Sequence, residues 1–174
     1  MNRIQTVVLA TVAAMSMPAW PQGLSQVWKD DGADNVWSTN EVSLNWDAGA
    51  AWTNGNSALF RGGEGTVFGE TVDVLATVTV ANVTFQTNGY VIADAEGDGL
   101  FLLAGAPSIV SVVNAGDTAT VSRVVGGSGG LAKAGTGLLN LTTNNAYSGT
   151  TTVSEGVLRL ARGNLMALGA TGSG

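Results

Sequence analysis

Residues 129–160 decide the fold, and they read GGLAKAGTGLLNLTTNNAYSGTTTVSEGVLRL. Leu139 and Leu141 are separated by one polar residue, and Leu158 and Leu160 are separated in the same way. Because successive side chains of a strand point to opposite faces, this alternation is typical of short strands that bury one face. Glycines separate these strands at positions where a chain must turn. The stretch therefore predicts an all-β architecture, and it contains no recognisable catalytic group.

The order of these residues resembles the autotransporter-associated β-strand repeat, also called the passenger-associated transport repeat. The resemblance implies a right-handed parallel β-helix in a secreted bacterial passenger. It assigns the matching residues a structural role and transfers no catalytic residue. The partners that it implies are an outer-membrane translocation pore or further repeats of the parent chain. The matching positions are Gly129, Gly130, Leu131, Lys133, Gly135, Gly137, Leu139, Leu141, Asn145, Tyr147, Gly149, Thr151, Val153, Gly156, Leu158 and Leu160.

The composition argues against an enzyme and against a nucleic-acid-binding protein. The 174 residues include no histidine and no cysteine, which removes the commonest general base, the commonest metal ligand and all thiol chemistry. The 13 acidic and 7 basic residues give a net charge of −6, which phosphates would repel. We therefore expect a non-enzymatic protein with no cofactor, no metal site and no nucleic-acid partner.

The N-terminus predicts an export signal over residues 1–19. Arg3 precedes an apolar run from Ile4 to Met17, and small residues lie near its end at Ala14 and Ser16 and after it at Ala19. A run of about 14 residues is too short to cross a bilayer as a helix but suits a signal peptide. We expect no transmembrane helix in the mature chain. Together with the resemblance, the signal predicts delivery to the cell surface, the outer membrane or the medium of a Gram-negative-type bacterium.

A tryptophan-rich segment occupies residues 20–65. Trp28, Trp37 and Trp46 recur every nine residues, and Trp52 follows. This spacing suits consecutive short strands better than one helical face. We interpret the segment as a cap over the N-terminal end of the β-helix. The alternative is a carbohydrate-binding or adhesin module, in which these four tryptophans form a platform for surface glycans, since flat aromatic rings can stack on sugars.

Residues 66–160 predict about four β-helical coils, with strand starts recurring every 8 to 12 residues. That cadence also suits a β-sandwich, which is the alternative fold; the resemblance favours the β-helix. Residues 161–174 look like the start of a further coil or a truncated linker, so we expect a fragment of a longer passenger. The side chains predicted to face inward are Val80, Val83, Phe85, Ile92, Leu102, Ile109, Val112, Val121, Leu139, Leu141, Val153, Leu158 and Leu160.

Two sets of acidic residues were candidates for chemistry. The first set, on short glycine-containing loops, fits no calcium-loop pattern and is interpreted as solvated turns. The second could supply paired carboxylates for glycan cleavage, but the sequence does not place these carboxylates at the separation that the reaction requires. The function that we predict is structural: surface display, with assistance to outer-membrane translocation as a further role. The first set is Asp30, Asp31, Asp34, Asp94, Glu96 and Asp98, and the second is Glu64, Glu70 and Asp73.

Overall fold

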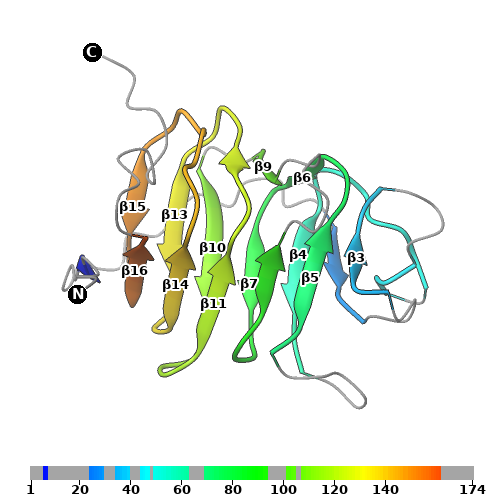
Figure 1. Cartoon of the computed structure of the whole chain (residues 1–174), viewed down its shortest axis with the longest axis horizontal. Coiled ribbons are helices and arrows are strands. Elements are labelled where there is room, and N and C mark those ends of the chain that lie inside the picture. Colours follow the sequence, from blue (N-terminus) through cyan, green and yellow to red (C-terminus); the bar gives the residue numbers. More distant parts are fainter. Residues whose placement is uncertain are drawn as a thin grey trace.

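The computed structural model describes residues 6–7, 24–29, 34–39, 44–47, 49–62, 69–93, 101–104 and 107–161. All the regular secondary structure in these residues is β-strand, arranged in three sheets (Figure 1). The first sheet has the order β1 (Thr6–Val7), β16 (Val157–Leu160), β14 (Leu138–Leu141), β11 (Thr118–Val121), β8 (Val91–Ala93), β5 (Thr71–Val74) and β3 (Val36–Trp37). The second has the order β15 (Thr151–Val153), β13 (Leu131–Ala134), β10 (Ser108–Val112), β7 (Val83–Phe85), β4 (Ser57–Phe60) and β2 (Ser25–Val27). The third has the order β12 (Val125–Gly126), β9 (Phe101–Leu103) and β6 (Val78–Val80).

The chain winds as a parallel β-solenoid. Strands β4 to β12 form three successive triplets, each with one strand in the second, first and third sheets in turn. Strands β13 and β14 begin the coil that follows these triplets. Its third side is the segment 145–148, in which Ala146 N donates to Val125 O over 2.8 Å and Ser148 N donates to Gly127 O over 3.0 Å. The predicted β-helix is therefore confirmed. The β-sandwich alternative is wrong, because a sandwich is built from antiparallel sheets and this stack pairs in parallel.

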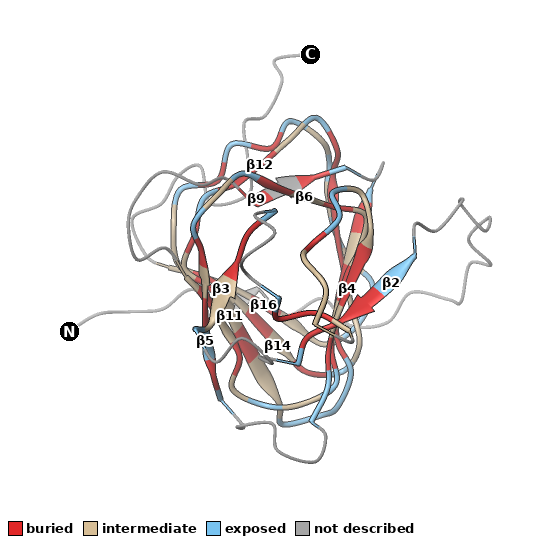
Figure 2. Cartoon of the chain, turned by 90° about the vertical axis from the view of Figure 1, so that its right-hand side faces the viewer, coloured by how far each residue is buried: buried red, intermediate tan, exposed pale blue. Residues whose placement is uncertain are grey.

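Alternating burial explains why these short segments form strands. In β10, for example, Ser108, Val110 and Val112 are buried, whereas Ile109 and Ser111 are half-buried. Figure 2, viewed along the solenoid from the end that carries β2 and β3, shows buried residues on the walls that surround its interior. Apolar side chains from successive coils thus form one continuous core, which no single coil could bury alone.

Most of the predicted inward residues are buried, with one correction. The prediction for Ile109 is wrong, because its neighbours Val110 and Val112 face the core instead. Pairing with β7 sets this register, with Val110 opposite Val83 and Val112 opposite Phe85. A one-residue slip exchanges the two faces of a strand, and the nearly continuous apolar run 109–113 contains no signal against the slip. The confirmed residues are Val80, Val83, Phe85, Ile92, Val112, Val121, Leu139, Leu141 and Leu158 in the core, with Val153 and Leu160 partly buried against it.

The side chain of Leu102 lies outside the described residues, but its neighbours Phe101 and Leu103 are both buried. The alternation in β9 thus places these two on the inward face.

The parallel ladders begin earlier in the chain than residue 66. Strand β2 pairs in parallel with β4, and β3 pairs with β5. The tryptophan-rich segment thus forms the first coil as well as the structure that ends it. Antiparallel bridges join Trp28 to Trp46 and Trp46 to Ala50, so the chain folds back across the end of the stack.

The predicted terminal segments lie mostly outside the described residues. Within residues 1–19 the structure describes Thr6–Val7, which pair antiparallel with β16 at Arg159 and Leu158. Of the predicted further coil at 161–174, it describes Ala161, whose N–H donates to Leu141 O over 3.0 Å. No helix long and apolar enough to cross a membrane occurs in the described part of the chain.

Candidate functional site

The repeat glycines lie where the backbones of neighbouring coils touch. A Cβ atom on Gly130 would overlap the carbonyl oxygen of Thr150, and one on Gly149 would overlap the backbone of Gly130. A Cβ on Gly135 or Gly156 would likewise meet a carbonyl oxygen of the coil next to it. The glycines thus permit backbone-to-backbone packing between coils as well as turns. Sequence spacing indicated only the turns.

Gly137 has a different neighbour. A Cβ at this position would lie 2.5 Å from Cγ1 of Val112 and 2.7 Å from the carbonyl oxygen of Asn114. Both atoms belong to the preceding coil. The missing side chain therefore lets β14 begin directly against β10 and the turn that follows it.

Lys133 is a fully buried lysine whose ammonium group joins two coils. Its Nζ donates to the carbonyl oxygens of Ala134 and Gly135, each over 2.6 Å, and to that of Glu155 over 3.2 Å. Three N–H donors thus meet three carbonyl acceptors at a corner of the solenoid. Burial lowers the pKa of Lys133 to about 8, and the charge of Glu155 opposes this shift. The arrangement gives the repeat lysine a structural role, because its donors are used by the backbone.

Asn145 and Tyr147 stabilise the third side of the same coil. Asn145 is buried, and its Oδ1 accepts from Val125 N over 3.0 Å, so the side chain takes the place of a main-chain carbonyl in the ladder. The Tyr147 ring is also buried, and its hydroxyl lies 2.7 Å from Oγ1 of Thr151. Burial raises the pKa of this phenol. Both side chains therefore hold the coil together.

The remaining repeat positions form the ladder and the core. Thr151 and Val153 of β15 pair with Leu131 and Lys133 of β13. Four leucines of the repeat are buried in the core: Leu131, Leu139, Leu141 and Leu158.

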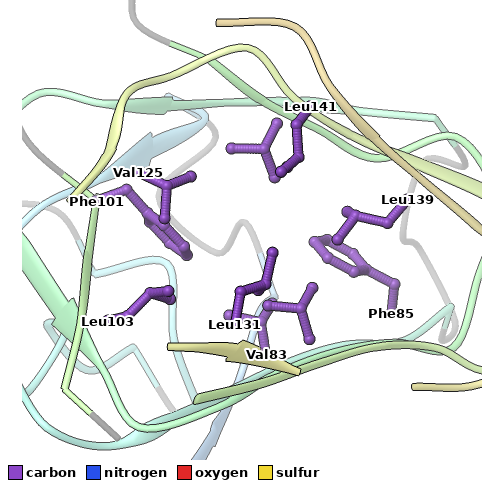
Figure 3. A pocket seen from close by; sticks show the side chains of 10 residues that line it. Val83, Phe85, Phe101, Leu103, Val125, Leu131, Leu139 and Leu141 are labelled. Atoms are coloured by element: carbon purple, nitrogen blue, oxygen red, sulfur yellow. The ribbon is translucent and has the colours of Figure 1, made fainter. Parts of the chain in front are cut away.

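The interior holds a small apolar void (Figure 3). Its volume of about 10 Å³ is near the lower limit for one water molecule, which would also need polar partners. Its walls offer only apolar side chains. These are Val83, Phe85, Phe101, Leu103, Val110, Val121, Val125, Leu131, Leu139 and Leu141.

The four tryptophans lie at the N-terminal end of the solenoid, opposite the repeat, and contact one another. The ring centroid of Trp46 lies 5.2 Å from that of Trp28, 5.0 Å from that of Trp37 and 4.7 Å from that of Trp52. Phe60 continues the cluster into the next coil, where it stacks on Phe85 at 5.1 Å. Edge-to-face and tilted pairs of this kind add stability beyond the burial of their area.

Burial of these rings bears directly on the glycan-platform alternative. Trp28, Trp37 and Trp46 are 0% exposed and Trp52 is 3% exposed. A sugar ring needs an open aromatic face, and neighbouring side chains cover all four. Trp28 Nε1 donates to Glu70 Oε2 over 3.2 Å, whereas the indole N–H groups of Trp37 and Trp46 have no hydrogen-bond partner among the described residues. The geometry thus favours the cap.

The acidic candidates do not assemble into a site in the described part of the chain. Asp30, Asp31, Glu64, Asp94, Glu96 and Asp98 lie outside it. Asp34 and Asp73 both take part in the structure of the first coils: the Asp34 Oδ1 accepts from Val36 N over 2.9 Å, and Asp73 pairs with Val36 in the sheet. Glu70 is buried against Trp28. No group of three or more metal-ligating side chains occurs among the described residues.

Comparison with known proteins agrees with this geometry. Residues 131–160 match the family model described as the passenger-associated-transport-repeat. Over 163 residues, 88% of this chain, the sequence is 31% identical to the Adhesin BmaC autotransporter of Brucella suis biovar 1 (strain 1330). The chain spans about 4% of the length of that relative. No solved structure matches the chain. The chain therefore carries an autotransporter passenger repeat, the passenger-associated transport repeat of residues 131–160.

Proposed function

We propose that this chain is a structural segment of a surface-displayed passenger, closed at its aromatic end and extended by further coils at its repeat end. Removal of the predicted signal peptide, which contains β1, would free the outer edge of β16 for the next coil. The observation that carries the proposal is the backbone contact between the last coils, at Gly130 with Gly149 and at Gly135 with Gly156. Contact of this kind needs a neighbouring coil and no ligand. The buried tryptophans and the apolar interior support the same reading, because neither offers a surface for chemistry.

The finer part of the proposal is that the repeat assists movement through the outer-membrane pore. Each coil finds hydrogen-bond partners and a core only on the coil beside it, so folding can spread along the axis one coil at a time. Coils that fold outside the pore would oppose backward movement of the chain. The repeat suits this role because its glycines and Lys133 make the contacts between coils largely through the backbone.

The test uses the complete passenger protein that contains this segment. Deletion of residues 129–160 should reduce the amount of passenger that an added protease can digest on intact cells, while the total amount in the cell stays similar. The matched control is Thr152→Val, which changes an exposed side chain of β15 and leaves every glycine in place. Unchanged surface delivery after the deletion would refute the translocation role and leave display alone.

Adhesion is the second candidate, and the name of the Brucella relative favours it. If glycans bound at the tryptophans, they would shift or quench indole fluorescence. Because all four rings are buried, we expect no change across a broad glycan panel. A saturable change that Trp52→Phe abolishes, and that the exposed-residue control Thr152→Val retains, would establish the carbohydrate-binding function instead.

A further inference from the structure

Two Asn-Gly dipeptides make the same unusual contact with the next coil. The sequence contains two such dipeptides, Asn54-Gly55 and Asn88-Gly89. Asn54 Oδ1 accepts from Thr79 N over 2.7 Å, and Gly55 N donates to Thr79 O over 2.8 Å. Each dipeptide thus binds both backbone groups of one threonine, with the asparagine side chain taking the place of a main-chain carbonyl.

The second dipeptide repeats this geometry on another side of the solenoid. Asn88 Oδ1 accepts from Thr118 N over 2.8 Å, and Gly89 N donates to Thr118 O over 2.8 Å. We call each of these two pairs an Asn-Gly clamp. Gly55 and Gly89 have φ angles of 88° and 90°, which glycine adopts without strain.

Asn-Gly is also the dipeptide in which asparagine loses its side-chain amide most readily. The glycine nitrogen can attack the asparagine Cγ, because glycine has no side chain to hinder the approach. The N–Cγ bond forms, the glycine nitrogen loses its proton, and the amide nitrogen leaves as ammonia. Water then opens the resulting succinimide at either carbonyl and gives aspartate or isoaspartate. The net change replaces NH₂ by OH, with no oxidation or reduction.

We infer that Asn54 and Asn88 are deamidation sites. They react in the unfolded chain, and the Asn-Gly clamps protect them from the reaction in the folded chain. The two groups that must meet in the reaction are the glycine N–H and the asparagine carboxamide. In each clamp both are bonded to a threonine of the next coil. Ring closure would have to break both bonds, so the reaction requires local opening of the coil.

The isoaspartate product would weaken the stack. Isoaspartate adds a methylene group to the main chain and moves the following glycine away from its threonine. At Gly89 this matters further, because a Cβ there would already lie 2.7 Å from the Cα of Gly69. Isoaspartate formed before folding should therefore remove a contact between coils.

The experiment compares the 174-residue chain in buffer with the same chain in urea. Peptide mass spectrometry should detect the gain of OH for NH₂ at Asn54 and Asn88 in urea, at least about tenfold faster than in buffer. Asn82 is the internal control. Its Oδ1 also accepts a backbone N–H of the next coil, from Ile109, but the residue after it is Val83, whose branched side chain hinders attack. Equal rates in buffer and urea, or no reaction at either site in urea, would overturn the inference.

A single variant separates the clamp from folding in general. Thr118→Pro removes the N–H that Asn88 Oδ1 accepts, at the first residue of β11, where strands tolerate proline. Asn88 should then react faster in buffer, while Asn54 keeps its wild-type rate. Equal protection of both sites in the folded variant would contradict the role of the clamp. Hydrogen exchange on the unmodified chain provides a second test: rapid exchange of the Gly55 and Gly89 amides in buffer would also refute it.

Discussion

The two ends of this solenoid are stabilised in opposite ways. At the N-terminal end four tryptophans and Phe60 fill the first coil with large rings. In the last coils the corresponding contacts are made by glycines, where the backbone of one coil touches that of the next. The aromatic end closes the stack because its bulk covers the first coil. The glycine end suits extension because its glycines let one coil pack backbone against backbone on the next.

Trp46→Ala should give the largest loss of stability. Trp46 contacts Trp28, Trp37, Trp52 and Phe60, so its removal leaves a cavity in the centre of the aromatic end. We expect a loss of about 4 kcal/mol in the free energy of unfolding, measured by urea denaturation. The control, Trp46→Phe, should lose less than half as much. Equal losses for both variants would contradict the cavity argument.

Gly130→Ala should be nearly as harmful, although it adds a single methyl group. That group would overlap the carbonyl oxygen of Thr150 in the next coil. We expect a loss of about 3 kcal/mol in urea denaturation. Gly116→Ala is the matched control: its Cβ meets nothing within 4 Å, and its φ of 88° alone should cost about 1 kcal/mol. A smaller loss for Gly130→Ala than for the control would refute close packing of the repeat backbone.

Lys133→Met should cost about 2 kcal/mol at pH 7, because three buried carbonyl oxygens lose their donor. Lys29→Met, at an exposed lysine, should leave the free energy of unfolding nearly unchanged in the same urea titration. If the two substitutions had the same effect, the ammonium group of Lys133 would contribute nothing to the corner.

The same residue should make stability depend on pH. Burial lowers the pKa of Lys133 to about 8 in the folded chain, from 10.5. Between these values the unfolded chain holds the proton that the folded chain has lost, so the free energy of unfolding should rise with pH across that window. Below pH 8 both states are protonated and this dependence should vanish. The measurement is the difference in unfolding free energy between wild type and Lys133→Met from pH 7 to 11. A difference that falls with rising pH would contradict the assignment.

Tyr147→Phe should have the smallest effect. The substitution removes the hydroxyl 2.7 Å from Thr151 Oγ1 and keeps the buried ring. We expect a loss of about 1 kcal/mol in the free energy of unfolding. Tyr147→Leu, which also removes the ring, should lose clearly more, and equal losses would place the stabilising contact in the hydroxyl instead of the ring.

Prediction of the buried residues from sequence succeeded where the apolar pattern fits a single strand register. It failed where several registers fit the same pattern. Leu139, Leu141 and Leu158 alternate with polar or half-buried neighbours, and all three are buried as expected. Ile109 lies in a run of apolar residues, so alternation could not choose its face, and pairing with β7 decided it. The Asn-Gly clamps could not be predicted either. Asn88-Gly89 indicates a turn, but its partner Thr118 lies in the next coil.

The sequence by itself determined the all-β class, because period-two alternation and glycine spacing are local properties of the chain. Its resemblance to a known repeat added the solenoid and the identity of the repeat. Only the tertiary structure decided what those residues touch. The coil-to-coil register places Gly130 against Thr150, brings the Lys133 ammonium to the Glu155 carbonyl and buries the four tryptophans against one another. These contacts join residues far apart in the chain, and their geometry arises only when one coil packs on the next.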